Sequence, residues 1–595
     1  MGTVECRRQP RYGSVGGDVG PSPLLKRHQE LLERALEAIR TREHWSPFPE
    51  EEAAYGERAA AEGEAAYREL LGEHFELDQP GGDGTVGPEP ARGGERSPYG
   101  GELGISYPHS DPSVLLPAMT DATASWRAAG PWERAAVCAE ILTRINARSF
   151  EFAHAAVHTS GHNFLMAFHA GAVHAQDRGL EAVAYALFEQ TRLPSTAIWR
   201  KPMPEGEDFV LAKTFTVVPR GVGLVVANRV FPTWNGYPGL FASLATGNAV
   251  LVKPHPRAVL PLALTVRIAR EVLADAGHDP NVVCLVAERP GERSAKDLAT
   301  RPEVRIVDYS GSAEFGRWLE DNARQAQVFT AKSAVNSLLV ESTARYRDML
   351  YNVAFSLALY SGQLCTSPQN LLIPRTGIST DEGHKTYARC VEDLAAAVTG
   401  LLADDAEAVG VLGALIGPDV LARVEYAASG AVGPVALAPR AVAHPRFPAA
   451  TVRTPTLVAL DAARDRDRAT LRSEWLGPVA FAVAVDSAAD GIELMRRTAQ
   501  EEGALSVGVY TTSPEVEAAV EDACERTGVM LSVNLVGNWF ITQSAVYSDL
   551  HSTGLNPSGN SVYCDGAYVA GRFRTVGVRR YGTGERTAPQ PAGRP

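Results

Sequence analysis

Hydrophobic positions recur at helical spacing near the start of the chain. Between Pro23 and Arg42 the apolar residues fall every three or four positions, which predicts an amphipathic helix. A second helix is predicted over residues 57–71. Residues 78–112 are rich in Gly, Pro and Asp, a composition that is typical of a long connecting loop.

From about Ser113 onward, helical patterns alternate with short β-branched runs. Such alternation indicates parallel strands joined by crossover helices, so the predicted fold class is α/β. A second alternating region begins near Val335. The predicted helices cover residues 131–147, 150–171 and 176–190, and the predicted strands cover residues 210–218, 221–227, 249–254, 282–287, 304–310, 337–340, 371–374, 481–485 and 506–510.

Composition narrows the class of protein. The chain has 595 residues, 57 Lys and Arg against 70 Asp and Glu, and a net charge of -13. That charge argues against nucleic acid or an anionic membrane as a partner. No window approaches the roughly 18 apolar residues that span a bilayer. The seven cysteines are scattered singly, so we expect reduced thiols and a cytoplasmic location.

Four local motifs carry the candidate chemistry. A Gly-rich turn between a strand and a helix, GSAEFG, directs backbone N–H groups to a position that suits a pyrophosphate. Taken alone, this turn also fits a simple helix cap, and Cys365 alone also fits a small buried residue. The motifs are GLVVANRVFPTWN with GNAVLVKPHP (223–256), GSAEFG (311–316), SGQLCTSPQN (361–370) and EWLGPV (474–479).

In this order and at these separations, the motifs resemble the NAD(P)-dependent aldehyde dehydrogenase superfamily over residues 115–575. The segments TAKSAVNSLLV and YSGQLCTSPQNLLIP are most similar to the PaaN-type proteins of phenylacetic acid degradation, which also have a helical N-terminal extension. The resemblance implies an oxidoreductase that transfers a hydride from an aldehyde to NAD or NADP. The implied substrate is a semialdehyde from aromatic catabolism or a related pathway.

The resemblance also implies roles for individual residues. Cys365 would attack the aldehyde and carry first a thiohemiacetal and then a thioester. Lys253 would hydrogen-bond the adenosine ribose, and Gly311 with Ser312 would hold the pyrophosphate at a helix N-terminus. Glu474 would accept hydrogen bonds from the nicotinamide ribose.

One departure from the family pattern concerns release of the acyl group. The glutamate that activates water in many members corresponds here to Ala331, which cannot move a proton. Two alternatives to a hydrolytic dehydrogenase therefore stay open. The chain could pass its acyl group to CoA, or it could be a homologue kept for binding or as a scaffold.

Two further departures affect the oxyanion and the cofactor. The asparagine that usually precedes Phe-Pro is Val230, which leaves the backbone N–H of Cys365 and the side chains of Asn228 or Asn235 as candidate oxyanion donors. The carboxylate that often disfavours a 2′-phosphate corresponds to Pro256, and its loss favours NADP slightly.

Histidines follow one predicted helix at steps of four residues. His154, His158 and His162 form this stripe, and His169 and His174 come after it. A metal site usually adds carboxylate or cysteine ligands that this helix mostly lacks, so a packed helix face is favoured and no metal is expected.

The predicted organisation ends with a C-terminal strand that pairs with a hairpin, either its own or that of a neighbouring copy. The resemblance implies a homodimer or homotetramer. The predicted parts are a partly disordered helical extension (1–114), a dinucleotide-binding domain (115–328) with the hairpin 196–218, a catalytic domain (329–540), an oligomerisation segment (541–582) and a disordered tail (583–595).

Overall fold

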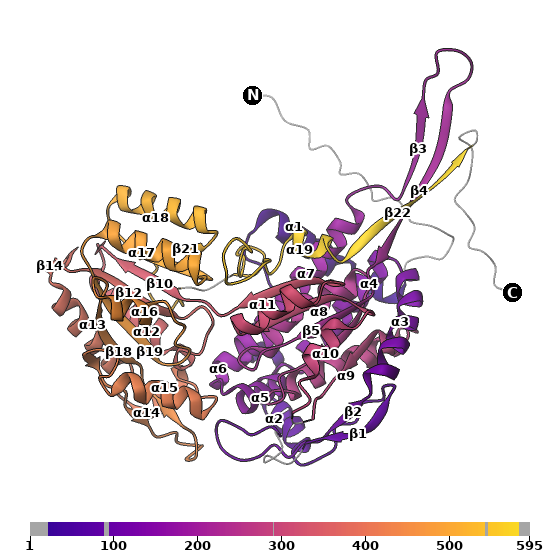
Figure 1. Cartoon of the computed structure of the whole chain (residues 1–595). Helices are drawn as coiled ribbons and strands as arrows, with labels where there is room; N and C mark the ends of the chain where they lie inside the picture. Colours follow the sequence, from indigo (N-terminus) through magenta and orange to yellow (C-terminus); the bar gives the residue numbers. More distant parts are fainter. Residues whose placement is uncertain (1–21, 88–93, 290, 542–544, 582–595) are drawn as a thin grey trace.

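The computed structural model describes residues 22–87, 94–289, 291–541 and 545–581. Within them the chain forms two lobes, and a long β arm projects from one of the lobes (Figure 1). Each lobe is built on a largely parallel sheet between layers of helices, which confirms the predicted α/β class. The disorder predicted for the two chain ends concerns residues that lie outside the described part.

The helical N-terminal region packs against the first lobe. Helix α1 lies on α4 and α7, where Leu32 and Ala35 are fully buried, and helix α2 lies on α5. The predicted loop over residues 78–112 contains two short antiparallel strands, and the polar sequence GDGTV of the first gave no strand pattern. The bounds are α1 (Pro23–Thr41), α2 (Ala59–Glu69), β1 (Gly82–Val86), β2 (Tyr107–Ser110), α3 (Pro112–Ala128), α4 (Pro131–Asn146), α5 (Ser149–Ser160) and α7 (His174–Thr191).

One predicted helix is wrong in its extent. The sequence predicts a single helix over residues 150–171, but α5 ends at Ser160 and Gly161 adopts a left-handed conformation with φ of 76°. His162 therefore leaves the predicted stripe, while His154 and His158 stack against Tyr67. The next segment restarts as a short helix and a π-helical turn, α6 (Phe164–Met166) and Ala167–Val173.

The first lobe contains five parallel strands in the order β7-β6-β5-β8-β9. Successive residues face opposite layers, so Leu224 packs with α3, α10 and α11 and Val225 packs with α4, α8 and α9. The strand order reverses between β5 and β8, where open parallel sheets bind ligands at their carboxyl ends. The bounds are β5 (Val222–Val226), α8 (Pro232–Ala245), β6 (Ala249–Lys253), α9 (Leu260–Asp275), β7 (Val283–Leu285), α10 (Ser294–Thr300), β8 (Val304–Gly311), α11 (Ala313–Asn322) and β9 (Gln327–Lys332).

The second lobe contains a seven-stranded sheet in the order β15-β18-β19-β12-β10-β20-β21, in which only β15 runs antiparallel to its neighbour. Leu338 faces the core under α12 and α13, and Leu339 faces the core under α17 and α18. The bounds are β10 (Asn336–Val340), α12 (Tyr346–Ala358), β12 (Pro368–Pro374), α13 (Tyr387–Leu401), β15 (Val435–Leu437), β18 (Thr456–Asp461), β19 (Val479–Val485), α17 (Ala488–Glu501), β20 (Ser506–Tyr510), α18 (Pro514–Thr527) and β21 (Met530–Val533).

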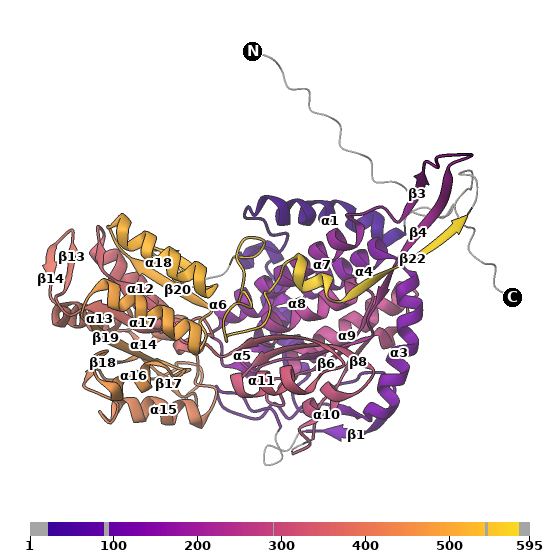
Figure 2. The same cartoon turned by 45° about the horizontal axis from the view of Figure 1, so that its top comes forward.

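The connection between the two sheets joins opposite kinds of sheet edge, a carboxyl edge and an amino edge. Strand β9 ends at Lys332 and β10 begins at Asn336, so the chain passes directly from the carboxyl edge of the first sheet to the amino edge of the second. Backbone hydrogen bonds join the lobes, for example from Ala414 N–H to Gly161 O at 2.9 Å. Figure 2 shows the two lobes side by side.

The projecting arm is a three-stranded antiparallel sheet in the order β22-β4-β3. Strand β22 pairs with β4 of the same chain, so the C-terminal strand joins its own hairpin. Several large apolar side chains of the arm are exposed to solvent. The strands are β3 (Thr196–Lys201), β4 (Phe209–Pro219) and β22 (Phe573–Tyr581), and the exposed side chains include Ile198, Trp199, Phe215, Val576 and Tyr581.

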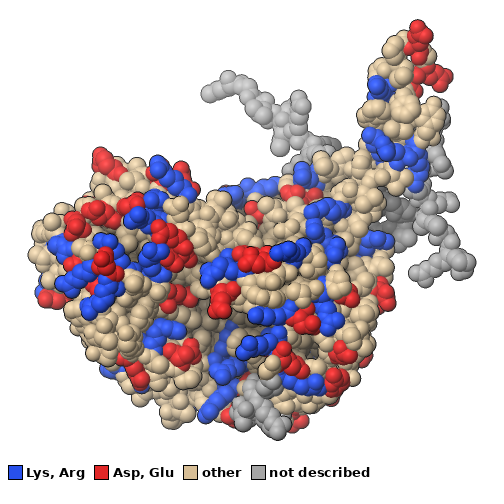
Figure 3. All heavy atoms as spheres, viewed as in Figure 1, with Lys and Arg blue, Asp and Glu red and all other residues tan. Residues whose placement is uncertain are grey.

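Acidic and basic side chains are interspersed on the face shown in Figure 3, with Lys and Arg denser along the hollow between the lobes. No helix in the described ranges has both the length and the apolar character needed to cross a bilayer. The described residues also hold no group of three or more His, Cys, Asp or Glu side chains arranged for a metal ion.

Candidate active site

The loop that carries Cys365 has an unusual backbone. After α12, Tyr360 and Ser361 adopt left-handed conformations with φ of 50° and 52°, which non-glycine residues rarely take. Side-chain hydrogen bonds hold this turn: the Tyr360 hydroxyl donates to Ser160 O, and the Ser361 hydroxyl donates to Gly413 O at 2.8 Å. The turn places Cys365 just before the amino end of β12, at the amino edge of the second sheet.

Asn336 anchors the same loop from β10. Its side-chain amide donates to Cys365 O at 2.8 Å and to Ser367 O at 3.2 Å. Its oxygen accepts from Leu505 N–H at 3.0 Å. One buried side chain thus ties the cysteine loop to β10 and to the start of β20.

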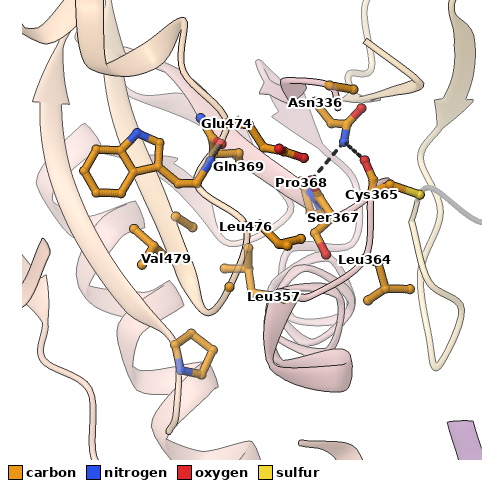
Figure 4. Close-up of a pocket in the computed structure, with 16 residues that line it drawn as sticks. Asn336, Leu357, Leu364, Cys365, Ser367, Pro368, Gln369, Glu474, Leu476 and Val479 are labelled. Carbon is orange, nitrogen blue, oxygen red and sulfur yellow. Dashed lines mark hydrogen bonds between the residues drawn. The ribbon is translucent and has the colours of Figure 1, made fainter. Parts of the chain in front are cut away.

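Cys365 and Glu474 line the same pocket (Figure 4). Glu474 precedes β19, so the pocket lies along the amino edge of the second sheet. The Cys365 sulfur is directed away from Glu474, toward the opposite side of the loop. The remaining lining includes Asn336, Leu357, Leu364, Gln369, Trp475 and Leu476.

The pocket shifts the pKa values of both groups. The Glu474 side chain opens on the pocket, yet the surrounding protein desolvates it and raises its pKa to about 6, while Arg423 and hydrogen bonds from Ala334 N–H and the Ser333 hydroxyl act in the opposite direction. Burial raises the pKa of the Cys365 thiol to about 12, and the charge of Glu474 adds to that effect. The resting thiol is therefore protonated at neutral pH.

Lys253 lies at the carboxyl end of β6, as the sequence indicates, and it is already paired. Its Nζ lies 3.0 Å from Glu288 Oε1, and the two side chains are only 7% and 14% exposed. Glu288 follows β7, the strand next to β6, and accepts a hydrogen bond from Ser294 N–H. A cation and a carboxylate side by side can bind two hydroxyls of a ribose.

Gly311 and Ser312 lie where β8 meets α11, next to the reversal of strand order. Ser312 caps the helix, and its hydroxyl accepts from Phe315 N–H at 3.4 Å. The first amide of the helix, on Ala313, donates to the Ser333 hydroxyl at 3.1 Å. Lys253, Gly311 and Ser312 all lie along the carboxyl edge of the first sheet. Their hydrogen-bond donors and acceptors suit the ribose and pyrophosphate of a dinucleotide.

The two candidate oxyanion residues differ in their surroundings. Asn228 is engaged in the turn after β5, because its amide donates to the Ser310 hydroxyl at 3.0 Å and its oxygen accepts from Phe231 N–H at 2.8 Å. Asn235 is buried in α8, and no hydrogen bond of its side chain occurs among the described residues. The Asn228 amide has thus one N–H left to donate, and the Asn235 amide has both.

Ala331 lies near the end of β9, where it pairs with Ser310 and bridges to Gly559. Its methyl group is buried and supplies no proton acceptor. A carboxylate close to it in the fold, Glu320, is held by Lys332 at 2.8 Å and by the Thr330 hydroxyl at 2.6 Å.

Two residues near these groups escaped the sequence analysis. Glu288 pairs with Lys253, and His551 Nε2 lies 3.7 Å from Cys365 Sγ. Neither belongs to a motif, and His551 is 186 positions away from the cysteine. The alanine at position 331 is the one sequence signal that could have prompted a search for another base, because it replaces the glutamate that activates water in many members of the family.

Comparison with known proteins gives a consistent result. The model of the aldehyde dehydrogenase family matches residues 96–543. A vanillin dehydrogenase from Pseudomonas fluorescens is 26% identical over 435 residues, which cover 71% of this chain and 83% of that protein. A fluoroacetaldehyde dehydrogenase from Streptantibioticus cattleyicolor is 27% identical over 277 residues, or 44% of this chain and 50% of that protein.

Solved structures share the whole architecture. The crystal structure of an NAD-dependent aldehyde dehydrogenase from Burkholderia multivorans superposes with a TM-score of 0.91 and 48% identity, over 95% of this chain and 100% of that chain. A 1-pyrroline-5-carboxylate dehydrogenase from Thermus with bound NAD superposes with a TM-score of 0.69 at 20% identity, over 90% and 99% of the two chains. The second likeness concerns the fold alone.

Proposed function

The chain belongs to the aldehyde dehydrogenase family of oxidoreductases, and we propose that it oxidises an aldehyde with NAD through a covalent intermediate on Cys365. One observation carries the proposal. Cys365 and Glu474 line one pocket of the second lobe, and Ser333 links that pocket to the carboxyl edge of the dinucleotide-type sheet, because its hydroxyl bonds Glu474 and accepts from Ala313 N–H at the start of α11. A nucleophile and a cofactor edge are thereby brought to one place.

In the proposed reaction, the Cys365 sulfur attacks the aldehyde carbonyl, and the oxygen becomes an alkoxide. The backbone N–H of Cys365 and the amide of Asn235 are the donors we assign to that oxygen. NAD, when bound, supplies the acceptor for the hydride, and the carbon is left as a thioester of Cys365. Lys253 binds the adenosine ribose, Gly311 and Ser312 hold the pyrophosphate, and Glu474 orients the nicotinamide ribose.

The Lys253–Glu288 pair supports NAD over NADP. A 2′-phosphate on the ribose next to Lys253 would meet the Glu288 carboxylate, and two anions at that distance repel. This preference is opposite to the slight one for NADP that Pro256 predicts. The carboxylate comes from β7 rather than from the segment that follows Lys253.

Two observations support the proposed substrate: the resemblance to the PaaN-type proteins and the aromatic side chains near the Cys365 sulfur. Trp234 and Tyr563 pack on His551, which contacts Cys365, so aromatic rings border the nucleophile. That wall suits an aldehyde with an apolar or aromatic body, and a vanillin dehydrogenase, which is among the relatives, is named for an aromatic aldehyde. We therefore keep the semialdehyde of phenylacetate-type aromatic catabolism as the proposed substrate.

A second candidate function follows from Ala331. Without a carboxylate at that position, the thioester could pass to a thiol such as CoA instead of water, which would make the protein a CoA-acylating dehydrogenase. Mixing the enzyme with aldehyde and NAD should produce NADH and an acyl adduct on Cys365 that is visible by intact mass. Acceleration by free CoA would favour the acylating reading.

Cys365→Ala should abolish NADH formation and leave NAD binding nearly unchanged. Wild-type turnover in this variant would overturn the proposal. Tight NAD binding without NADH from any aldehyde of a broad panel would favour the scaffold alternative.

The arm supports assembly with further copies of the chain. Val576 and Tyr581 are 53% and 79% exposed on a sheet that projects from the body, and such an apolar surface is costly to leave in water. A homodimer or homotetramer in the cytoplasm is the proposed state, and its mass in solution is the test.

A further inference from the structure

His551 belongs to the C-terminal segment between β21 and β22. Its backbone pairs with Tyr563 in both directions, with N–H···O distances of 3.2 and 3.1 Å, and only 4% of the residue is exposed. The Tyr563 ring stacks on the imidazole at 6.2 Å, and Trp234 meets it edge-on at 4.8 Å. The ring is therefore held in one orientation by backbone and aromatic contacts.

That orientation directs His551 at the proposed nucleophile. Nε2 lies 3.7 Å from Cys365 Sγ, within reach of a hydrogen bond to sulfur. The sulfur is directed away from Glu474 (Figure 4), so the imidazole and the Glu474 carboxylate lie on different sides of the cysteine. A proton acceptor on the His551 side stays clear of the surface that the cofactor is proposed to use.

The imidazole is uncharged at neutral pH. Burial and the nearby Arg178 guanidinium lower the pKa of His551 to about 3. The titratable or charged groups that face the ring are Cys365, its bridge partner Tyr563 and Arg178 from α7. Arg178 is paired with Glu181 at 2.8 Å. A neutral imidazole with its proton on Nδ1 has a lone pair on Nε2, which faces the sulfur. Its low pKa makes it a weak base toward the free thiol, so the proton moves to Nε2 only as the C–S bond forms and the sulfur becomes acidic.

The chemistry needs such a group. The Cys365 thiol is protonated at rest, and a thiol is a weak nucleophile until its proton is taken. Ala331 cannot take it, and Glu320 is held by Lys332. Within the part of the chain that the structure describes, the basic nitrogen found next to Cys365 Sγ is Nε2 of His551.

We infer that His551 is the proton acceptor of this site and stands in for the carboxylate missing at position 331. The inference rests on the proposed function. As Sγ attacks the carbonyl carbon, the S–H bond breaks and Nε2 takes the proton, which then leaves to solvent. Once the carbon is left as a thioester, Nε2 takes a proton from the water that attacks it; the C–S bond breaks, the acid leaves, and the Cys365 thiolate that remains takes the proton back from Nε2.

The test compares His551→Gln and His551→Ala with the wild type, with NAD and an aldehyde that the wild type oxidises. Two rates are measured: the pre-steady-state burst of NADH, and alkylation of Cys365 by iodoacetamide between pH 6 and 10. We expect both variants to lose a hundredfold or more of the burst rate, as for other removed general bases. Imidazole added to His551→Ala should restore part of the burst, which a merely structural role would not allow.

Two control variants separate the possible failures. His158→Gln removes a half-buried histidine that stacks on Tyr67, away from the sulfur, and should keep the wild-type burst. Cys365→Ser should abolish the burst, and its failure to do so would overturn the proposed function itself.

A His551→Gln burst within threefold of the wild type, with Cys365→Ser inactive, would overturn only the role of His551. A large loss in both His551 variants without imidazole rescue, and with NAD affinity unchanged, would overturn it as well and leave His551 a packing residue.

Discussion

Gly362 and Gly477 join the nucleophile loop to the Glu474 loop through their backbones, because Gly477 N–H donates to Gly362 O at 3.2 Å. The approach is so close that a Cβ on Gly362 would lie 2.5 Å from Gly477 O. The contact fixes Cys365 and Glu474 relative to each other on loops that precede two different strands.

Gly362→Ala should therefore disturb catalysis more than stability. The new methyl group must push the two loops apart, and a misplacement of about 1 Å costs on the order of 10²-fold in rate. The φ of +62° adds about 1 kcal/mol of backbone strain. Gly383→Ala is the matched control, because Gly383 has φ of +94° and nothing within 4 Å of its Cβ position. Burst kinetics and thermal unfolding of both variants check the prediction, and equal rate losses would contradict it.

Glu288→Gln should shift the cofactor preference toward NADP. Removing the charge beside Lys253 removes the repulsion of a 2′-phosphate, and we expect NADP to bind about tenfold more tightly, equivalent to about 1.4 kcal/mol. NAD should lose a few-fold in affinity because the ribose loses a strong acceptor. Quenching of the protein's tryptophan fluorescence on titration with NAD and with NADP measures both affinities. Glu271→Gln, on an exposed position of α9, removes one charge elsewhere and should change neither.

Glu474→Gln should make the Cys365 thiol more acidic. The Glu474 carboxylate disfavours the thiolate, so its removal lowers the thiol pKa and moves the iodoacetamide profile to lower pH. Burial still acts on the thiol, so the shift is partial. Glu521→Gln on α18 is the control, and identical profiles for all three proteins would contradict the coupling.

The same carboxyl makes stability depend on pH. Its pKa of about 6 in the folded protein exceeds the ordinary value of 4.5, so the folded state binds the proton more tightly. The stabilisation is present below pH 4.5 and is lost as the pH rises through 6. Glu474→Gln should thus melt higher than the wild type at pH 8 but not at pH 4. Solvent in the pocket keeps the difference below about 1 kcal/mol.

Asp308→Ala should destabilise the arm. Asp308 on β8 and Arg572 form a fully buried ion pair with N–O distances of 2.6 and 2.7 Å, and Arg572 directly precedes β22. Removing one partner leaves a buried charge uncompensated, at a cost of about 3–5 kcal/mol. Combining Asp308→Ala with Arg572→Leu should recover part of that loss. Denaturant unfolding and hydrogen exchange in β22 measure the effect, and a single-variant loss under about 1 kcal/mol would contradict it.

The strands of the two main sheets were predictable from the sequence because helices cover both faces of each sheet. The strand predicted over residues 249–254 corresponds to β6 (Ala249–Lys253), since a parallel strand covered by helices on both faces must be apolar along its whole length. Strands such as β1, with four of five residues exposed, have no such requirement and left no pattern. The predicted helix over 150–171 failed at Gly161, where apolar spacing continues but the backbone turns.

By itself the sequence determined the order of strands and helices and the local motifs that mark Cys365, Lys253 and Glu474, because backbone turns and strand ends are encoded by neighbouring residues. Only the tertiary structure decided which side chains meet those three. His551 reaches Cys365 across 186 positions, and Glu288 reaches Lys253 from the adjacent strand. Contacts between distant segments depend on how the sheets and the C-terminal segment pack, and no local pattern of residues encodes that packing.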